Sequence, residues 1–159
     1  MLLLMLVVNL ESRKYKSVNR DGVTAVIINK GKILLLKRAS FPLMSHKGVW
    51  SFLTGGRERK ERHIETAYRE IKEEINVDKS QLKLILKDKM VTLTDPKEKI
   101  QWNNRFFIFQ SKTRKVKLDL ENRAYKWVTL KQLQAHENVL TDYIPNRNYI
   151  FRLIKSALK

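Results

Sequence analysis

The sequence predicts an α/β fold in a single domain, residues 1–159. Short runs of β-branched and aromatic residues alternate with a few helix-periodic segments, a pattern typical of a sheet covered by helices. Hydrophobic residues make up 43% of the chain, which at this length supplies one sizeable core. With only five Gly and three Pro, the composition leaves no room for a long flexible linker.

The first predicted elements are a β-hairpin and a short strand. Residues 23–28 form a β-branched run, an Asn-Lys-Gly turn signal stands at 29–31, and residues 33–36 resume the apolar run. Residues 40–47 contain a proline and favour a loop. A short strand at residues 49–52 then leads into a Gly-Gly pair.

The remaining elements alternate between helices and strands. Thr129 and Gln132 have the spacing of a capping box, which opens a short helix. Apolar residues from Tyr149 to Leu158 recur on one helical stripe. In chain order, the sequence predicts a helix at 64–75, strands at 82–86, 90–93, 105–109 and 127–128, the short helix from 129, and a last helix over the stripe.

The N-terminus and the cysteine count restrict the class of protein. The chain begins MLLLMLVV, eight apolar residues, whereas a membrane-spanning helix needs roughly 20. We therefore expect residues 1–20 to be an N-terminal strand or tail of the same domain, and no membrane partner. The chain has no Cys, which excludes disulfides, thiol catalysis and cysteine-ligated metal sites and fits a cytoplasmic location.

The charge balance favours phosphate-rich ligands. The chain has 33 Lys and Arg against 16 Asp and Glu, a formal net charge of +17. Nucleotides, nucleic acid and anionic membrane surfaces all suit such a charge. The basic residues are spread along the chain without a dense block, so a solvated basic surface is the alternative interpretation.

Against this basic background, acidic residues gather in one segment, 55–77. On the predicted helix Arg69, Glu70, Glu73 and Glu74 fall within an arc of about 140°, separate from the apolar face. Carboxylates on one face repel one another, and hard cations such as Mg²⁺ or Mn²⁺ relieve that repulsion. An ordinary helix with an acidic outer face is the alternative. The acids of the segment are Glu58, Glu61, Glu65, Glu70, Glu73 and Glu74.

The spacing around this face argues against the alternative. The segment is written Gly55-x5-Glu61-x7-Arg69-Glu70-Ile71-x-Glu73-Glu74-x-Asn76-Val77. It resembles the box of the Nudix hydrolase family (MutT-like), G-x5-E-x7-R-E-U-x-E-E-x-G-U, where U is bulky and aliphatic. The one departure is Asn76 in place of Gly. Since Asn is the next-best residue for a left-handed helix end, this departure leaves the acidic face untouched.

The resemblance extends, more weakly, to about residues 23–133. Family members often have W-x-F-P-G-G before the box, where this chain has Trp50-Ser51-Phe52-Leu53-Thr54-Gly55. In the family the backbone carbonyl at the Thr54 position often binds the metal. Glu121 stands six residues before Trp127, where some members place a further metal ligand or the base.

The resemblance implies a fold, a reaction and roles for the residues. The fold is an α/β/α sandwich with a mixed sheet between helices. The reaction is divalent-metal-dependent hydrolysis of a nucleoside diphosphate linked to another group. Glu73 and Glu74 are then metal ligands, together with Thr54 and Glu121, and Glu70 is a ligand or the general base. Glu61 then acts through a metal-bound water, and Arg69 orients a Glu, so both belong with Glu70 to the catalytic set.

Three further residues are candidates for substrate binding. Arg38 ends a strand that faces the substrate in this family, Trp102 precedes an aromatic strand, and Asn146 precedes the last helix. Each has a structural alternative: a surface Arg, a packed Trp and a helix N-cap. His46, His63 and His136 are interpreted as surface or loop residues.

Other activities of the same family remain open. The isoprenyl diphosphate isomerases of the family use a catalytic Cys, which this chain lacks. RNA decapping is consistent with the positive charge, and homodimers are common in the family. A non-catalytic nucleotide- or nucleic-acid-binding module is the alternative from another class. Such modules commonly lose box acids, and all four acids of the motif are present here.

Overall fold

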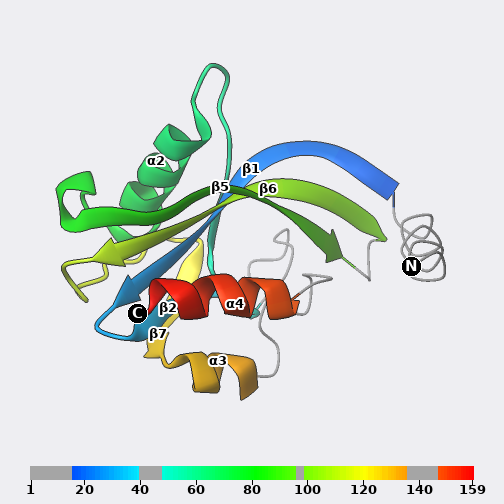
Figure 1. Ribbon diagram of the computed structural model, residues 1–159. Helices are drawn as coiled ribbons and strands as arrows, with labels where there is room; N and C mark the ends of the chain where they lie inside the picture. The colour runs from blue at the N-terminus through cyan, green and yellow to red at the C-terminus, as the bar shows by residue number, and fades with distance from the viewer. Residues whose placement is uncertain (1–15, 40–47, 96–98, 136–146) are drawn as a thin grey trace.

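The computed structural model describes residues 16–39, 48–95, 99–135 and 147–159. Its centre is a seven-stranded mixed sheet with helices on both faces, which confirms the predicted α/β/α arrangement (Figure 1). The elements are β1 (Lys16–Asn29), β2 (Lys32–Arg38), β3 (Trp50–Ser51), β4 (Leu53–Gly56), α2 (His63–Ile75), the 3₁₀ turn η1 (Lys79–Gln81), β5 (Leu82–Asp95), β6 (Ile100–Ser111), β7 (Asn122–Val128), α3 (Leu130–Ala135) and α4 (Arg147–Ala157).

β1 is the strand on which the sheet is built. The main strand order is β3-β2-β1-β6-β5, with β4 paired to β1 and β7 paired to β2. β1 and β6 run parallel, and the other pairs are antiparallel. The predicted hairpin is present between β1 and β2. Lys30 and Gly31 both have positive φ, as a tight turn of this kind requires.

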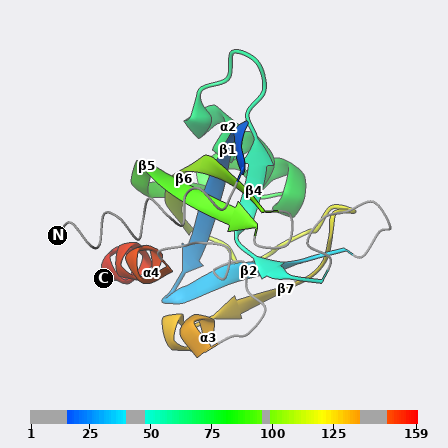
Figure 2. The same cartoon turned by 90° about the vertical axis from the view of Figure 1, so that its right-hand side faces the viewer.

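The two faces of the sheet carry separate cores. Alternate residues of β1 divide between them, so that Ala25 and Ile27 pack under α2, whereas Val26 and Ile28 pack on the other side. The second core is completed by α3 and α4, which contribute Leu133 and other buried residues. Figures 1 and 2 show α2 over one face and α3 with α4 over the other.

The helix ends match the sequence prediction. Asn76 has φ 54° and ψ 36°, and its backbone N–H donates to the carbonyl oxygen of Lys72, so it ends α2 in the left-handed conformation. Thr129 and Gln132 form the predicted capping box, in which each side chain accepts a hydrogen bond from the backbone N–H of the other.

Several strands are longer than predicted, whereas the single strand predicted at 49–52 is replaced by the two-residue β3 and by β4, which begins at Leu53. Residues 82–86 and 90–93 were expected as two strands, but β5 is one strand over Leu82–Asp95. Its pairing with β6 shifts register between Leu84 and Leu86 and again before Lys89, and such bulges interrupt the apolar alternation. β7 likewise begins at Asn122, ahead of the predicted pair 127–128.

Some predictions concern segments that lie outside the described residues. These are the N-terminal segment 1–15, the loop at 40–47, His46, His136 and Asn146. Within the described ranges, no helix is both long enough and apolar enough to cross a membrane.

Gly22 allows β1 and β4 to approach closely. An added Cβ on Gly22 would lie 2.6 Å from the backbone oxygen of Gly55 and 3.1 Å from Oδ1 of Asn104. A β-carbon does not fit at that distance from a backbone atom, so the close approach depends on Gly22.

Gly22→Ala is expected to lower the free energy of unfolding by about 1–3 kcal/mol, because the backbone must shift to relieve the contact with Gly55. Thermal unfolding measures the loss. Gly56→Ala is the matched control, since an added Cβ there meets nothing within 4 Å. Equal melting temperatures for the two variants would contradict the packing argument.

Candidate active site

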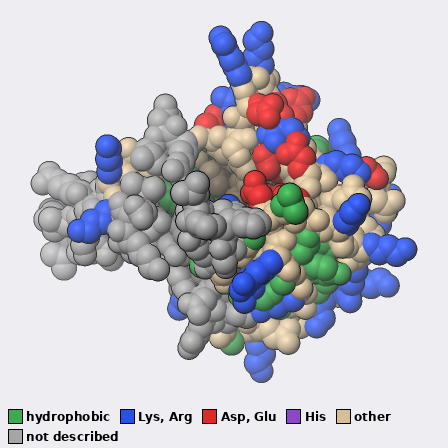
Figure 3. Space-filling view, turned by 180° about the vertical axis from the view of Figure 1, so that it is seen from behind, with side chains coloured by type: hydrophobic (Ala, Val, Ile, Leu, Met, Phe, Trp, Pro, Cys, Tyr) green, Lys and Arg blue, Asp and Glu red, His purple; other side chains and the backbone are tan. Residues whose placement is uncertain are grey.

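Three acidic side chains of α2 and of the segment before it, Glu61, Glu70 and Glu73, gather around Arg69. Figure 3 shows acidic side chains collected on one part of a mostly basic face. Arg69 donates through Nε and Nη2 to the two oxygens of Glu61 at 2.8 and 3.1 Å. Its Nη1 donates to Oε1 of Glu70 at 2.8 Å and to Oε2 of Glu73 at 3.1 Å. Nη2 also donates to the carbonyl oxygen of Gly56 at 2.9 Å.

Glu61 accepts two hydrogen bonds from Arg69, whereas Glu70 and Glu73 accept one each. Besides Arg69, its Oε2 accepts hydrogen bonds from the backbone N–H of Glu58 and from Oγ1 of Thr66. The hydrogen bond from Arg69 is the largest cause that lowers the pKa of Glu61, to about 2. Glu61 therefore stays ionised and anchors the guanidinium.

Glu70 is packed against the glycine that opens the box. A Cβ on Gly55 would lie 2.0 Å from Cδ of Glu70, so only glycine leaves space for this carboxylate. Burial raises the pKa of Glu70, against the lowering effect of Arg69, and Glu73 and Glu121 raise it further. The rise marks a place where negative charge is already concentrated.

Glu74 is the buried acid of the group, with 8% of its surface exposed. Nδ2 of Asn122 donates to its Oε2 at 2.9 Å. Burial raises the pKa of Glu74 to about 8, and Glu70, Asp119 and Glu121 add to the rise. Without a cation nearby, this carboxyl group is mostly protonated at neutral pH.

The residues at the start of β7 and just before it complete one side of the acidic group. The backbone N–H of Asp119 donates to the carbonyl oxygen of Glu74, and Oδ1 of Asp119 accepts from Nδ2 of Asn122. Glu121 is exposed, and its Oε2 lies 3.9 Å from Nη2 of Arg38. The sequence singled out neither Asp119 nor Asn122. The nearness of Asn122 to Glu121 in the chain was the only available signal.

The structure does not bring all predicted site residues together. Glu61, Arg69, Glu70 and Glu73 are in direct contact, as described above. Thr54 lies in β4 beside Gly55 and pairs with Thr24 of β1. Trp102 packs against the core on the other face of the sheet from α2, away from the acids.

The donor set suits a hard divalent cation, although the ligands are not gathered into a cage. Over the described ranges, no three His, Asp or Glu residues are close enough together to hold a metal ion. The reason is visible in the contacts: Glu70 and Glu73 turn to Arg69, whereas Glu74 turns to Asn122. Burial and then neighbouring carboxylates raise the pKa values of Glu70 and Glu74, and a Mg²⁺ or Mn²⁺ ion would favour their ionised forms.

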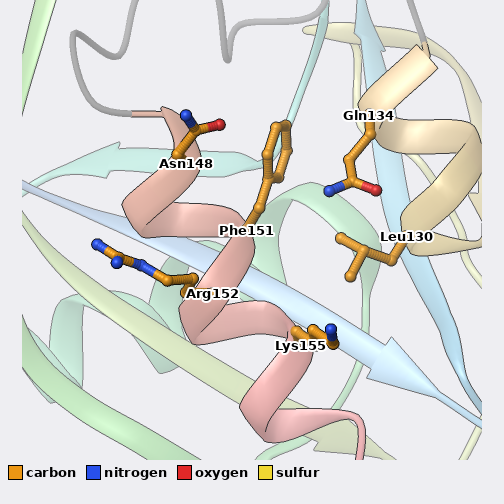
Figure 4. Close-up of a pocket in the computed structure, with 6 residues that line it drawn as sticks. All are labelled: Leu130, Gln134, Asn148, Phe151, Arg152 and Lys155. Atoms are coloured by element: carbon orange, nitrogen blue, oxygen red, sulfur yellow. The ribbon is translucent and has the colours of Figure 1, made fainter.

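Two pockets lie beside the helices, and Glu61 is one of the residues that line the second. One, of about 510 Å³, lies between α3 and α4 on the opposite face of the sheet, with Leu130 and Phe151 as its apolar part (Figure 4). The other, of about 430 Å³, lies beside the start of α2, with Ile64 and Phe107 as its apolar part.

Comparison of whole structures finds the same architecture in known proteins. An Ap4A hydrolase from C. elegans, solved as a binary complex, superposes with a TM-score of 0.68 at 24% identity, covering 87% of this chain and 97% of that one. A MutT protein from Methanosarcina mazei Go1 gives 0.69 at 23%, covering 92% and 99%. The E. coli dihydroneopterin triphosphate pyrophosphohydrolase gives 0.60 at 23%, covering 79% and 95%.

Comparison of the sequence with family models identifies the family of this chain. No curated protein sequence matches the chain significantly. The model of the NUDIX domain, however, matches residues 18–151, which is most of the chain. The matched segment contains the whole box and the strands that position it. The chain therefore belongs to the NUDIX domain family, the Nudix hydrolases whose box motif it carries.

Proposed function

We propose that the protein hydrolyses a nucleoside diphosphate linked to another group, with Mg²⁺ or Mn²⁺ as cofactor. The observation that carries the proposal is the pair of carboxyl groups with raised pKa values, Glu70 and Glu74, beside the acids that Arg69 holds. Known proteins of the same fold are an Ap4A hydrolase and a pyrophosphohydrolase of dihydroneopterin triphosphate. The bond to be cleaved is accordingly a phosphoric anhydride.

Glu73 and Glu74 would hold the metal, with the Thr54 carbonyl and Glu121 completing the set. A divalent ion held there would offset the negative charge of the diphosphate and make it easier for the attacking water to lose a proton. Glu70 is the proposed base, because its raised pKa makes it a stronger proton acceptor than an ordinary carboxylate. Arg69 fixes the orientation of Glu70 and Glu73, and Glu61 fixes Arg69.

Arg38 is the proposed contact to a substrate phosphate. Its Nε is buried and has no hydrogen-bond partner among the described residues, and its ion pair with Glu121 is long at 3.9 Å. A phosphate oxygen would satisfy this donor. A screen of nucleoside triphosphates, ADP-ribose, dinucleoside polyphosphates and capped RNA, with Mg²⁺ and Mn²⁺, tests the proposed function and identifies the substrate. Lack of turnover on every class would refute it.

Glu74→Gln is expected to lower turnover on the order of 10³-fold, because one metal ligand is lost. The melting temperature of the metal-free protein at pH 7 should rise, because Gln stays neutral in both states, whereas Glu74 ionises when the chain unfolds. Glu65→Gln is the control, because Glu65 lies on the same helix and contacts Arg62 instead. Wild-type activity in Glu74→Gln would refute the ligand assignment.

The stability of the metal-free protein should fall as pH rises from about 4.5 to about 8. The pKa of Glu74 is about 8 in the folded state against 4.5 ordinarily, so the folded state binds its proton more tightly. The stabilisation that this proton supplies is complete below pH 4.5 and is lost as the pH rises through about 8. Denaturant unfolding of wild type and Glu74→Gln measures it, and identical pH profiles would exclude this role of Glu74.

Stabilisation by Mn²⁺ should grow over the same pH range. The ion must displace the Glu74 proton, so binding strengthens as that group ionises. At 100 times the dissociation constant, stabilisation amounts to about 2.7 kcal/mol. Thermal shift measurements at several pH values check this result. The double variant Glu73→Gln/Glu74→Gln should show no metal response, and an unchanged response would identify the acidic face as mere solvated surface.

Arg38→Gln is expected to raise KM for the best substrate of the screen about tenfold, the loss of roughly 1.4 kcal/mol of phosphate binding. Steady-state kinetics measure the change. Arg152→Gln, in α4 on the opposite face of the sheet, should leave KM as it is. A KM equal to that of the wild type in Arg38→Gln would remove the residue from the proposed substrate site.

A further inference from the structure

We propose that Asp21, which lies outside the box, is a positioning residue for the catalytic acids. It acts on residues 57–62, here called the box loop, which connect β4 to α2 and carry Glu61. The inference rests on the proposed function, because it concerns how the proposed catalytic groups are held.

The β1–β4 ladder brings Asp21 to the box loop. Gly22 pairs with Gly56 at the end of the ladder, so the next step places Asp21 opposite Arg57. The backbone N–H of Arg57 donates to the carbonyl oxygen of Asp21 at 2.9 Å, which continues the ladder into the loop. The close approach of the two strands at Gly22, described above, makes this step possible.

The side chain of Asp21 then binds both ends of the box loop. Its Oδ2 accepts a hydrogen bond from Nε of Arg57, and its Oδ1 pairs with Nε2 of His63, the first residue of α2. Burial opposes ionisation of Asp21, but the hydrogen bonds from His63 and Arg57 outweigh it and hold the pKa of Asp21 below its usual value. One carboxylate thus closes the loop at its two ends.

From Arg57 the contacts lead directly to the proposed catalytic groups. Nη1 of Arg57 donates to the carbonyl oxygen of Glu61 at 2.9 Å. The carboxylate of Glu61 accepts two hydrogen bonds from Arg69, and Arg69 in turn holds Glu70 and Glu73. Removal of the Asp21 carboxylate frees Arg57, and the backbone of Glu61 then loses a fixed donor.

The box loop is too exposed for core packing to fix its position. Arg57, Glu58, Arg59, Lys60 and Arg62 are all exposed, and Glu61 is half-buried. The pocket of about 430 Å³ at the start of α2 adjoins the same segment. Hydrogen bonds and ion pairs therefore fix the loop, and those of Asp21 are the ones that tie it to the sheet.

Asp21→Asn is the test variant, with Asp21→Glu as the conservative one. Asp78→Asn is the matched control, because Asp78 forms an exposed ion pair with Lys72 at the other end of α2. We expect kcat to fall about tenfold or more in Asp21→Asn, with KM within about twofold, because displaced catalytic groups slow the chemical step. Asp21→Glu should restore most of kcat, and Asp78→Asn should keep wild-type kcat.

Hydrogen–deuterium exchange supplies a readout that does not depend on turnover. The amides of the box loop should exchange faster in Asp21→Asn, whereas those near the end of α2 should not change. Lack of turnover in the wild type would refute the proposed function, and the exchange result would still decide whether Asp21 holds the loop. Unchanged exchange overturns the proposal. A wild-type kcat in Asp21→Asn, or a loss of kcat that merely follows the melting temperature in all three variants, also overturns it.

Discussion

The guanidinium of Arg69 is the contact on which the acidic face of α2 depends. Glu61, Glu70 and Glu73 would repel one another if they faced solvent alone, and Arg69 places a positive charge with five directed donors among them. The same group also bonds the carbonyl oxygen of Gly56, so it joins the helix to the end of β4. A lysine would supply the charge but not the fixed geometry, because only the planar fork reaches several acceptors at once.

The environment divides chemically identical side chains into two kinds. Glu61 receives donors on both oxygens and has its pKa lowered to about 2, whereas Glu74 is buried and has its pKa raised to about 8. The first is suited to a permanent structural charge, because it does not take up a proton near neutral pH. The second changes its protonation state in the physiological range, and a cation shifts that equilibrium. Acid–base chemistry by carboxylates requires pKa values that are separated in this way.

Local signals in the sequence predicted the local structure well. The hairpin turn, the Asn76 cap and the helix of the box depend on neighbours in the chain, and the spacing of the motif placed the acids on one face. The strands were predicted too short because residues at the start of β1 and β6 are mostly polar and are held by pairing with each other, which composition does not reveal. Asn122 and Asp21 could not be found in this way. Asn122 reaches Glu74 across 48 residues and Asp21 reaches His63 across 42, so only the fold brings them together.

The parallel pairing of β1 with β6 has a consequence for the order of folding. Val23 of β1 lies beside Arg105 of β6, and the box helix is in the segment between them. Because closing so long a loop costs chain entropy before its contacts form, such pairings are slow steps. The hairpin of β1 and β2 and the isolated turns of α2 can form early, but Asn122 reaches Glu74 only when the chain beyond β6 has been made and folded back. During synthesis the acidic face is therefore assembled late, after most of the chain has emerged.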